Sequence, residues 1–213
     1  MMANIVVQFL LKGGPVMVPI LLCTVVAVAV VGERSFWWFR ESRRRDSRKL
    51  EQILAALENQ DVPAAIAAAQ GSNDPIIRMI HSGLTHAHSS MQGALQLAAG
   101  IELERAGRFL TVMDTLVTLA PLLGLLGTVT GLMRAFLSVG SAELSVAAVT
   151  GGIGEALIAT ACGLGIAIFS LIPFNFFTAR VGRLQFELET AASNVEVMVQ
   201  ASKGPTHMVE AQK

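Results

Sequence analysis

The sequence predicts an all-α membrane protein with three transmembrane helices, of which the second and third extend into a helical cytoplasmic domain. Three observations support this fold class. Its 213 residues are 53% hydrophobic and 15% charged, with a mean hydropathy of +0.57, whereas about 25% of residues are charged in an average soluble protein. Three charge-free stretches approach or reach the ~20 residues that a helix needs to cross a bilayer. Basic residues are concentrated after the first stretch.

The candidate spans are separated by one long and one short connection. The charge-free stretches cover Gly13–Gly32, Thr115–Met133 and Ala156–Ala179, and an apolar approach from Leu144 precedes the third. We therefore expect an outer amino-terminal segment with transmembrane helix 1 (1–38), a cytoplasmic helical insert (39–110), transmembrane helix 2 (111–137), an outer loop (138–147), transmembrane helix 3 (148–179), and a cytoplasmic helix and tail (180–213).

The basic residues beside the spans predict the orientation, because the cytoplasmic side of a membrane protein carries an excess of Lys and Arg. Only Lys12 precedes the first span, which is followed by Arg34, Arg40, Arg43, Arg44, Arg45, Arg48 and Lys49. We therefore expect the amino terminus outside and the carboxyl terminus inside. A cleaved signal peptide, with a site at Ala27-Val28-Ala29, is the rival interpretation. Such a peptide carries its positive charge before the apolar run, so an uncleaved anchor is favoured.

The cytoplasmic insert is expected to form short packed helices. Breaks are predicted at Asp61–Pro63, at Gly71–Pro75 and near Ser89. From Ser90 to Thr111 the pattern continues without proline, which predicts one long helix that enters span two. Apolar residues at spacings of three and four predict that Val181–Gln200 extends span three on the inner side, followed by a frayed tail from Lys203 to Lys213.

Several function classes are disfavoured by the composition. Sixteen Lys and Arg against sixteen Asp and Glu leave no basic surface for nucleic acid. His81, His86 and His88 lie on a polar segment without ligands at metal-site spacing, so surface histidines are expected and no metal or other cofactor is. The spans contain no His, and Cys23 and Cys162 fall in different spans as small apolar residues. We expect no enzyme activity.

Glu155 is the candidate functional residue, because it is the single charge between Leu144 and Ala179. An ionisable group within a bilayer is costly unless it faces water or a partner. If span three begins near Ala147, the 1.5 Å rise per residue places Glu155 about 12 Å inside. Small residues surround it at helical spacing, and Thr128, Thr130, Thr150 and Thr160 supply hydroxyls. These features favour proton or ion handling over the alternative, an acid at the outer helix end.

Small residues at helix-packing spacing indicate close helix contacts. Gly127 and Gly131 form a GxxxG motif, and Gly152, Ala156 and Thr160 repeat the spacing in span three. Three spans can scarcely enclose a pore with their own side chains, whereas several copies in a ring can. The sequence therefore predicts a homo-oligomer.

Two ordered motifs resemble those of the MotA/TolQ/ExbB proton channel family in its ExbB/TolQ branch. The first covers Ala120–Gly131 (APLLGLLGTVTG) with Phe136, and the second covers Gly152–Ala161 (GIGEALIATA) with Gly163-Leu164. The opening Gly13–Met17 and Glu33-Arg34 look more like ExbB than TolQ. Where the family often has Ala-Ile-Pro, this chain has Ala-Ile-Phe ending at Phe169, and Pro173 follows four residues later.

The resemblance implies a multi-pass protein of the bacterial inner membrane. Five copies would surround a pore that holds the transmembrane helices of a dimeric, single-span, ExbD-like partner and passes protons inward. Its proton pathway maps onto Glu155, Thr160 and Thr128. The proton motive force would then act through a TonB-like protein to energise transport across the outer membrane. A TolQ-like subunit for envelope integrity and a non-conducting membrane scaffold are the alternatives.

Overall fold

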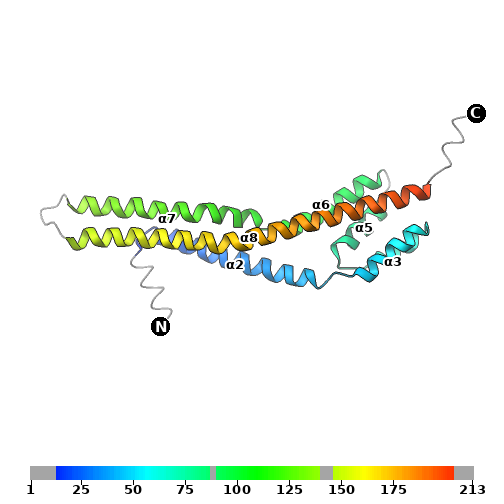
Figure 1. The fold of residues 1–213 in the computed structure, drawn as a ribbon, viewed down its shortest axis with the longest axis horizontal. Coiled ribbons are helices and arrows are strands. Elements are labelled where there is room, and N and C mark those ends of the chain that lie inside the picture. The colour runs from blue at the N-terminus through cyan, green and yellow to red at the C-terminus, as the bar shows by residue number, and fades with distance from the viewer. Residues whose placement is uncertain (1–12, 87–89, 140–145, 204–213) are drawn as a thin grey trace, which may run out of the picture. The chain divides into compact units, whose positions relative to one another are not determined.

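The computed structural model describes residues 13–86, 90–139 and 146–203. Figure 1 shows that this part of the chain is built from helices and connections. The helices are α2 (Met17–Ser42), α3 (Ser47–Glu58), α4 (Val62–Ala69), α5 (Pro75–Thr85), α6 (Met91–Gly107), α7 (Leu110–Val139) and α8 (Val146–Lys203). The predicted break near Ser89, most of the predicted outer loop and nearly all of the predicted tail lie outside the described residues.

The prediction of an all-α protein with three membrane-spanning helices is confirmed. Three helical stretches are long and apolar enough to cross a bilayer: Met17–Ser42, Met91–Leu137 and Val149–Gln200. In their most apolar windows only 28%, 22% and 22% of the residues are buried within the chain. The remaining apolar surface, which includes Leu122, Phe136 and Leu157, needs lipid or another protein to cover it.

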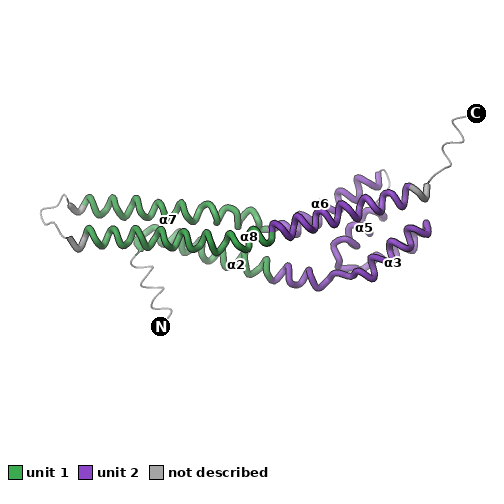
Figure 2. The backbone as a smooth tube through the Cα atoms, in the orientation of Figure 1, with its two compact units in different colours: residues 1–35, 109–177 green, residues 36–108, 178–213 purple. Residues whose placement is uncertain are grey.

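The chain divides into two compact units, which Figure 2 shows in different colours. The membrane unit comprises residues 1–35 and 109–177, and the polar unit comprises residues 36–108 and 178–213. In the membrane unit, a cluster of buried apolar side chains joins α2, α7 and α8. Its members are Val16, Met17, Ile20, Cys23, Ala27, Leu116, Ala120, Ala159 and Ile166.

The polar unit is made of short helices that begin at capping residues. Asp46, Asp61, Asp74 and Ser90 each accept a hydrogen bond from a backbone N–H of the first turn that follows them. Pro63 and Pro75 stand in the first turns of α4 and α5, where a missing N–H costs nothing. The breaks predicted at Asp61–Pro63 and Gly71–Pro75 are therefore present, and Ile53, Leu57, Ile77, Ile80, Leu95 and Leu188 belong to the core that these helices enclose.

The prediction of one long helix from Ser90 into span two is wrong. α6 ends at Gly107, and α7 begins at Leu110. Phe109 has a φ of 65°, a left-handed conformation that costs a non-glycine residue about 1–2 kcal/mol. Gly107, the last residue of α6, has the lowest helix propensity of the residues beside the break. The break also coincides with the boundary between the two units.

The predicted extension of span three is confirmed, because α8 runs without interruption from Val146 to Lys203. Pro173 lies within α8, where it removes one backbone hydrogen bond without ending the helix. Beyond it, Leu184, Leu188, Val195 and Val199 are buried at spacings that are multiples of about one helical turn.

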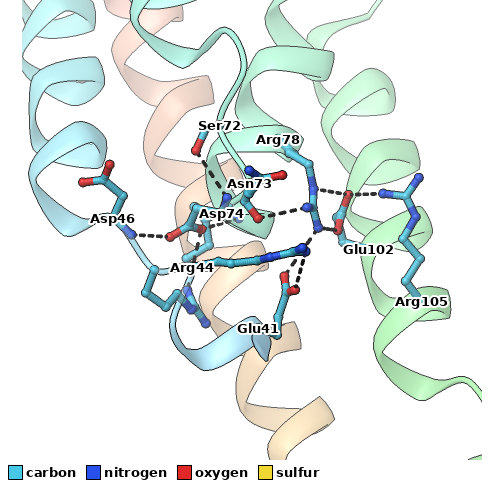
Figure 3. A network of polar contacts seen from close by, with 11 residues as sticks. Glu41, Arg44, Asp46, Ser72, Asn73, Asp74, Arg78, Glu102 and Arg105 are labelled. Carbon is cyan, nitrogen blue, oxygen red and sulfur yellow. Dashed lines mark hydrogen bonds and ion pairs between the residues drawn. The ribbon is translucent and has the colours of Figure 1, made fainter. Parts of the chain in front are cut away.

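Arg78 is the centre of an ion-pair network in the polar unit (Figure 3). Its Nε and Nη2 donate to the two carboxylate oxygens of Glu102 at 3.1 and 2.5 Å, and Nη2 lies 3.5 Å from Glu41. Its Nη1 donates to the carbonyl oxygen of Asn73 at 2.9 Å. Glu102 also accepts from Arg105 at 3.0 Å. One guanidinium on α5 therefore connects acids on α2 and α6.

Asp74 extends the same network toward the start of α3. Its carboxylate accepts from the backbone N–H of Ile76 at 2.9 Å and from that of Asp46 at 3.0 Å. Arg45 lies 4.0 Å from Asp74 and also pairs with Glu187 of α8. Burial lowers the pKa of Arg78, but the hydrogen bond and charge of Glu102, with the charges of Glu41 and Asp74, outweigh it and raise this pKa above its usual value. Arg78 therefore stays charged.

Replacing Arg78 by Met tests the contribution of this network to stability. The side chains of Glu41 and Glu102 are only 6% and 7% exposed. Arg78→Met removes the cation that they share and leaves each with one other arginine, Arg44 and Arg105 respectively. The cost should therefore fall below the about 3–5 kcal/mol of a buried charge that loses its only partner. We expect a clearly lower midpoint of thermal unfolding in detergent. Arg48→Met, at an exposed position of α3, is the control and should leave the midpoint nearly unchanged; equal midpoints for both variants would contradict the expectation.

Candidate functional site

Glu155 lies on α8, and its carboxylate is held by an arginine of α7. Oε1 of Glu155 is 2.7 Å from Nη2 of Arg134, and the Glu155 side chain is 20% exposed. Gly14, which lies just before α2, contacts this ion pair. A Cβ added to Gly14 would lie 1.7 Å from Glu155 Oε1 and 3.1 Å from Arg134 Nη2. α7, α8 and the segment that leads into α2 therefore meet at this carboxylate.

Gly14 has the conformation that this arrangement requires. Its φ is +69°, a region that residues with a side chain seldom adopt. The backbone can then pass directly beside the Glu155 carboxylate before Pro15 leads into α2. This position therefore requires glycine for two reasons: the backbone is left-handed, and the Glu155 carboxylate leaves no space for a Cβ.

α7 and α8 approach each other along a line of small residues. A Cβ at Gly127 would lie 2.4 Å from the Cβ of Ala159, and one at Gly131 would lie 3.0 Å from that of Ala156. One at Gly152 would lie 2.8 Å from the Cβ of Ala135. The packing residues predicted from the sequence, Gly127, Gly131, Gly152 and Ala156, thus make their contacts between two helices of the same chain.

The predicted pathway threonines have different surroundings. Oγ1 of Thr160 donates to the carbonyl oxygen of Gly124 at 2.9 Å, so this hydroxyl crosses from α8 to α7. Oγ1 of Thr128 donates to the carbonyl oxygen of Leu125 at 2.6 Å, within its own helix. Thr160 is therefore part of the contact between the helices, whereas Thr128 makes a local bond of the kind that threonine commonly makes in a helix.

Sequence reasoning missed two members of this site, Arg134 and Gly14. Arg134 lies just past the charge-free stretch that stops at Met133, near the end of the predicted span 111–137, and nothing in the local sequence pairs it with Glu155. The two are paired by the register of the helices. Gly131 contacts Ala156 and Gly152 contacts Ala135, and Arg134 and Glu155 each lie next to one of these contact residues, so they fall at the same level of the two antiparallel helices. Gly14 likewise carries no sequence signal for its contact with Glu155.

The other side-chain types considered from the sequence do not assemble into a second site in the described residues. No group of three or more His, Cys, Asp or Glu side chains lies close enough there to hold a metal ion. His86 is exposed, with Nδ1 2.9 Å from the carbonyl oxygen of Ser82, and His88 lies outside the described residues. Cys23 and Cys162 are free thiols in or against the apolar cluster of the membrane unit.

The fold and the site define a class of protein: a multi-span α-helical membrane protein with an ion-paired acid between its second and third spans. Comparison with known families identifies which one. The model of the MotA/TolQ/ExbB proton channel family matches residues 71–190, more than half of the chain. The chain belongs to this family, and its relatives place it in the ExbB branch.

Three relatives illustrate this placement. The biopolymer transport protein ExbB-like 3 of Synechocystis is 38% identical over 174 residues, which cover 78% of this chain and 82% of that protein. ExbB-like 1 of the same organism is 36% identical over 197 residues, which cover 88% of this chain and 76% of that protein. The biopolymer transport protein ExbB of Salmonella typhimurium is 29% identical over 194 residues, which cover 84% of this chain and 78% of that protein. The similarity thus extends over most of the chain.

Two glycines of α8 give a matched test of the helix contact that positions the site. A Cβ at Gly163 would lie 2.5 Å from the carbonyl oxygen of Ala120 and 3.0 Å from Cα of Gly124, whereas one at Gly165 has nothing within 4 Å. Gly163→Ala must push the helices apart, and overpacking of this kind costs about 1–3 kcal/mol. Gly165→Ala should be neutral or stabilising because alanine favours helix. Thermal unfolding in detergent should separate the two variants; a lower midpoint for Gly165→Ala would contradict this packing.

Proposed function

We propose that the chain is an ExbB-like subunit of a proton channel in the bacterial inner membrane, which uses the proton motive force to energise a TonB-type transport system of the outer membrane. One observation carries this proposal. Glu155, on the third span, lies 2.7 Å from Arg134 on the second span, beside the seam of small residues where the two helices pack. Membership of a proton channel family supports the chemistry, and the ExbB relatives support the transport role.

A carboxyl group at this depth can take up and release a proton, which a neutral helix surface cannot. Thr160 adds a hydroxyl between the helices, and Thr128 adds one on α7; a hydroxyl can both donate and accept. A proton that crosses the bilayer releases about 2.3 kcal/mol for each 100 mV of membrane potential. We propose that Glu155, Thr160 and Thr128 form the pathway through which this energy is used.

The remaining parts of the proposal concern topology and assembly. The basic residues after the first span favour an outer amino terminus and an inner carboxyl terminus. The exposed apolar faces of the three spans favour a homo-oligomer, and the family resemblance favours five copies. An ExbD-like dimer would then occupy the pore, and a TonB-like protein would carry the force, because this chain offers no sizeable outer domain between its second and third spans.

Replacing Glu155 by Gln tests the function directly. The amide keeps the size and hydrogen bonding of the side chain but cannot ionise. In cells that lack their own copy, Glu155→Gln should abolish energised uptake across the outer membrane while the assembled complex retains its mass in native mass spectrometry. Glu58→Gln, an exposed position of α3, is the control and should support normal uptake. Full uptake with Glu155→Gln would instead favour a non-conducting scaffold.

The threonines should matter less than the acid. Thr160→Val removes the bond to Gly124, and Thr128→Val removes a local one. The Thr160 bond crosses between helices, and such polar bonds in membranes contribute about 0.6 kcal/mol on average and up to about 1.7, whereas the Thr128 bond is local. We therefore expect each Val variant to reduce proton flux without abolishing it. Thr160→Ser and Thr128→Ser keep the hydroxyl and should conduct nearly normally. Flux in liposomes that contain the partner is the measurement, and a Ser variant as impaired as its Val variant would contradict a hydroxyl role.

A further inference from the structure

The ion pair between Arg134 and Glu155 occupies one oxygen of the carboxylate that the proposed function needs. Both residues belong to candidate membrane spans, Arg134 to Met91–Leu137 and Glu155 to Val149–Gln200. The guanidinium occupies Oε1 at 2.7 Å, and the backbone of Gly14 covers the same oxygen. A proton that approaches Oε1 therefore meets either a positive charge or the peptide backbone.

The chemistry of arginine makes this contact an obstacle to proton transfer. A guanidinium remains charged at all physiological pH values and has five N–H donors but no acceptor, so it can neither take up a proton from the pathway nor pass one on. A fixed positive charge also repels cations and protons, which is how an arginine excludes protons from water channels. While the pair is closed, Glu155 cannot exchange a proton through Oε1.

The pair can open without disrupting the helix contact. The side chain of Arg134 is 45% exposed, whereas that of Glu155 is 20% exposed. Neither residue belongs to the seam of small residues, which Gly131, Ala135, Gly152 and Ala156 form beside them. The guanidinium can therefore swing away on its flexible stem while α7 and α8 remain packed.

We infer that Arg134 is a positioning residue that latches Glu155 in a non-conducting arrangement, and that proton transfer requires this pair to open. The inference rests on the proposed function, since it specifies how the proposed proton carrier is kept closed. On this inference, Arg134 limits proton transfer through Glu155 when the partner protein is absent. Loss of the guanidinium should raise the reactivity of Glu155 and the passive leak of protons together.

Carbodiimide labelling tests the latch independently of transport. A hydrophobic carbodiimide reacts with a protonated membrane carboxyl group, and mass spectrometry of the peptide that contains Glu155 reports the rate. We expect Arg134→Gln to label about tenfold faster than the unmodified protein, which corresponds to about 1.4 kcal/mol of lost pairing. Arg134→Lys keeps the charge and should label slowly. Arg105→Gln removes an arginine from the polar unit and should not change the rate. Equal rates for the unmodified protein and Arg134→Gln would overturn the latch.

Proton flux into liposomes separates the latch from the proposed function. With this chain alone, Arg134→Gln should leak several-fold more than the unmodified protein, and adding Glu155→Gln to the same chain should remove the excess. No excess leak, or a leak that survives the double substitution, would overturn the latch. No flux from the unmodified protein with its partner would instead overturn the proposed function. Native mass spectrometry checks that each variant assembles. If Arg134→Gln does not assemble, Arg134→Met takes its place in both measurements, with the same expected and contradicting outcomes.

Discussion

At Gly163 the backbone of α8 comes so close to α7 that an added Cβ would lie 2.5 Å from the carbonyl oxygen of Ala120, and the rest of the membrane unit depends on this close approach. Lipid is as apolar as leucine, so helices in a membrane gain little from burying large apolar side chains against each other. Close contact between the helix backbones stabilises the pair instead, through van der Waals packing. It also brings a hydroxyl of one helix within 2.9 Å of a carbonyl oxygen of the other, at Thr160 and Gly124.

The same seam determines where the larger side chains can lie. Residues on the contact line, such as Ala156 and Ala159, are almost fully buried, while their larger neighbours are displaced to its flanks. Glu155 and Arg134 are neighbours of this kind, and their short distance is a consequence of helix packing that neither residue creates. A substitution on the seam can therefore change the site chemistry without touching a charged group.

The sequence alone was sufficient for the parts of the fold that depend on local patterns. Apolar length identified the spans, and capping and proline signals identified the breaks at Asp61 and Asp74. It failed at Phe109, where nothing in the pattern marks a left-handed residue between two good helices. Long-range charge pairs were also missed. The network around Arg78 joins residues far apart in the chain, and the partner of Glu155 depends on the register of two antiparallel helices, which no local pattern specifies.

An acid within a bilayer needs a partner, and this chain supplies one from its own second span. The carboxylate of Glu155 therefore has its ion-pair partner within a single chain. The energy scales of the proposed latch can be compared. The tenfold change in labelling rate expected above corresponds to about 1.4 kcal/mol, and one proton that crosses 100 mV releases about 2.3 kcal/mol. A latch of that size would hold the carboxylate at rest and would still open when a proton crosses the membrane.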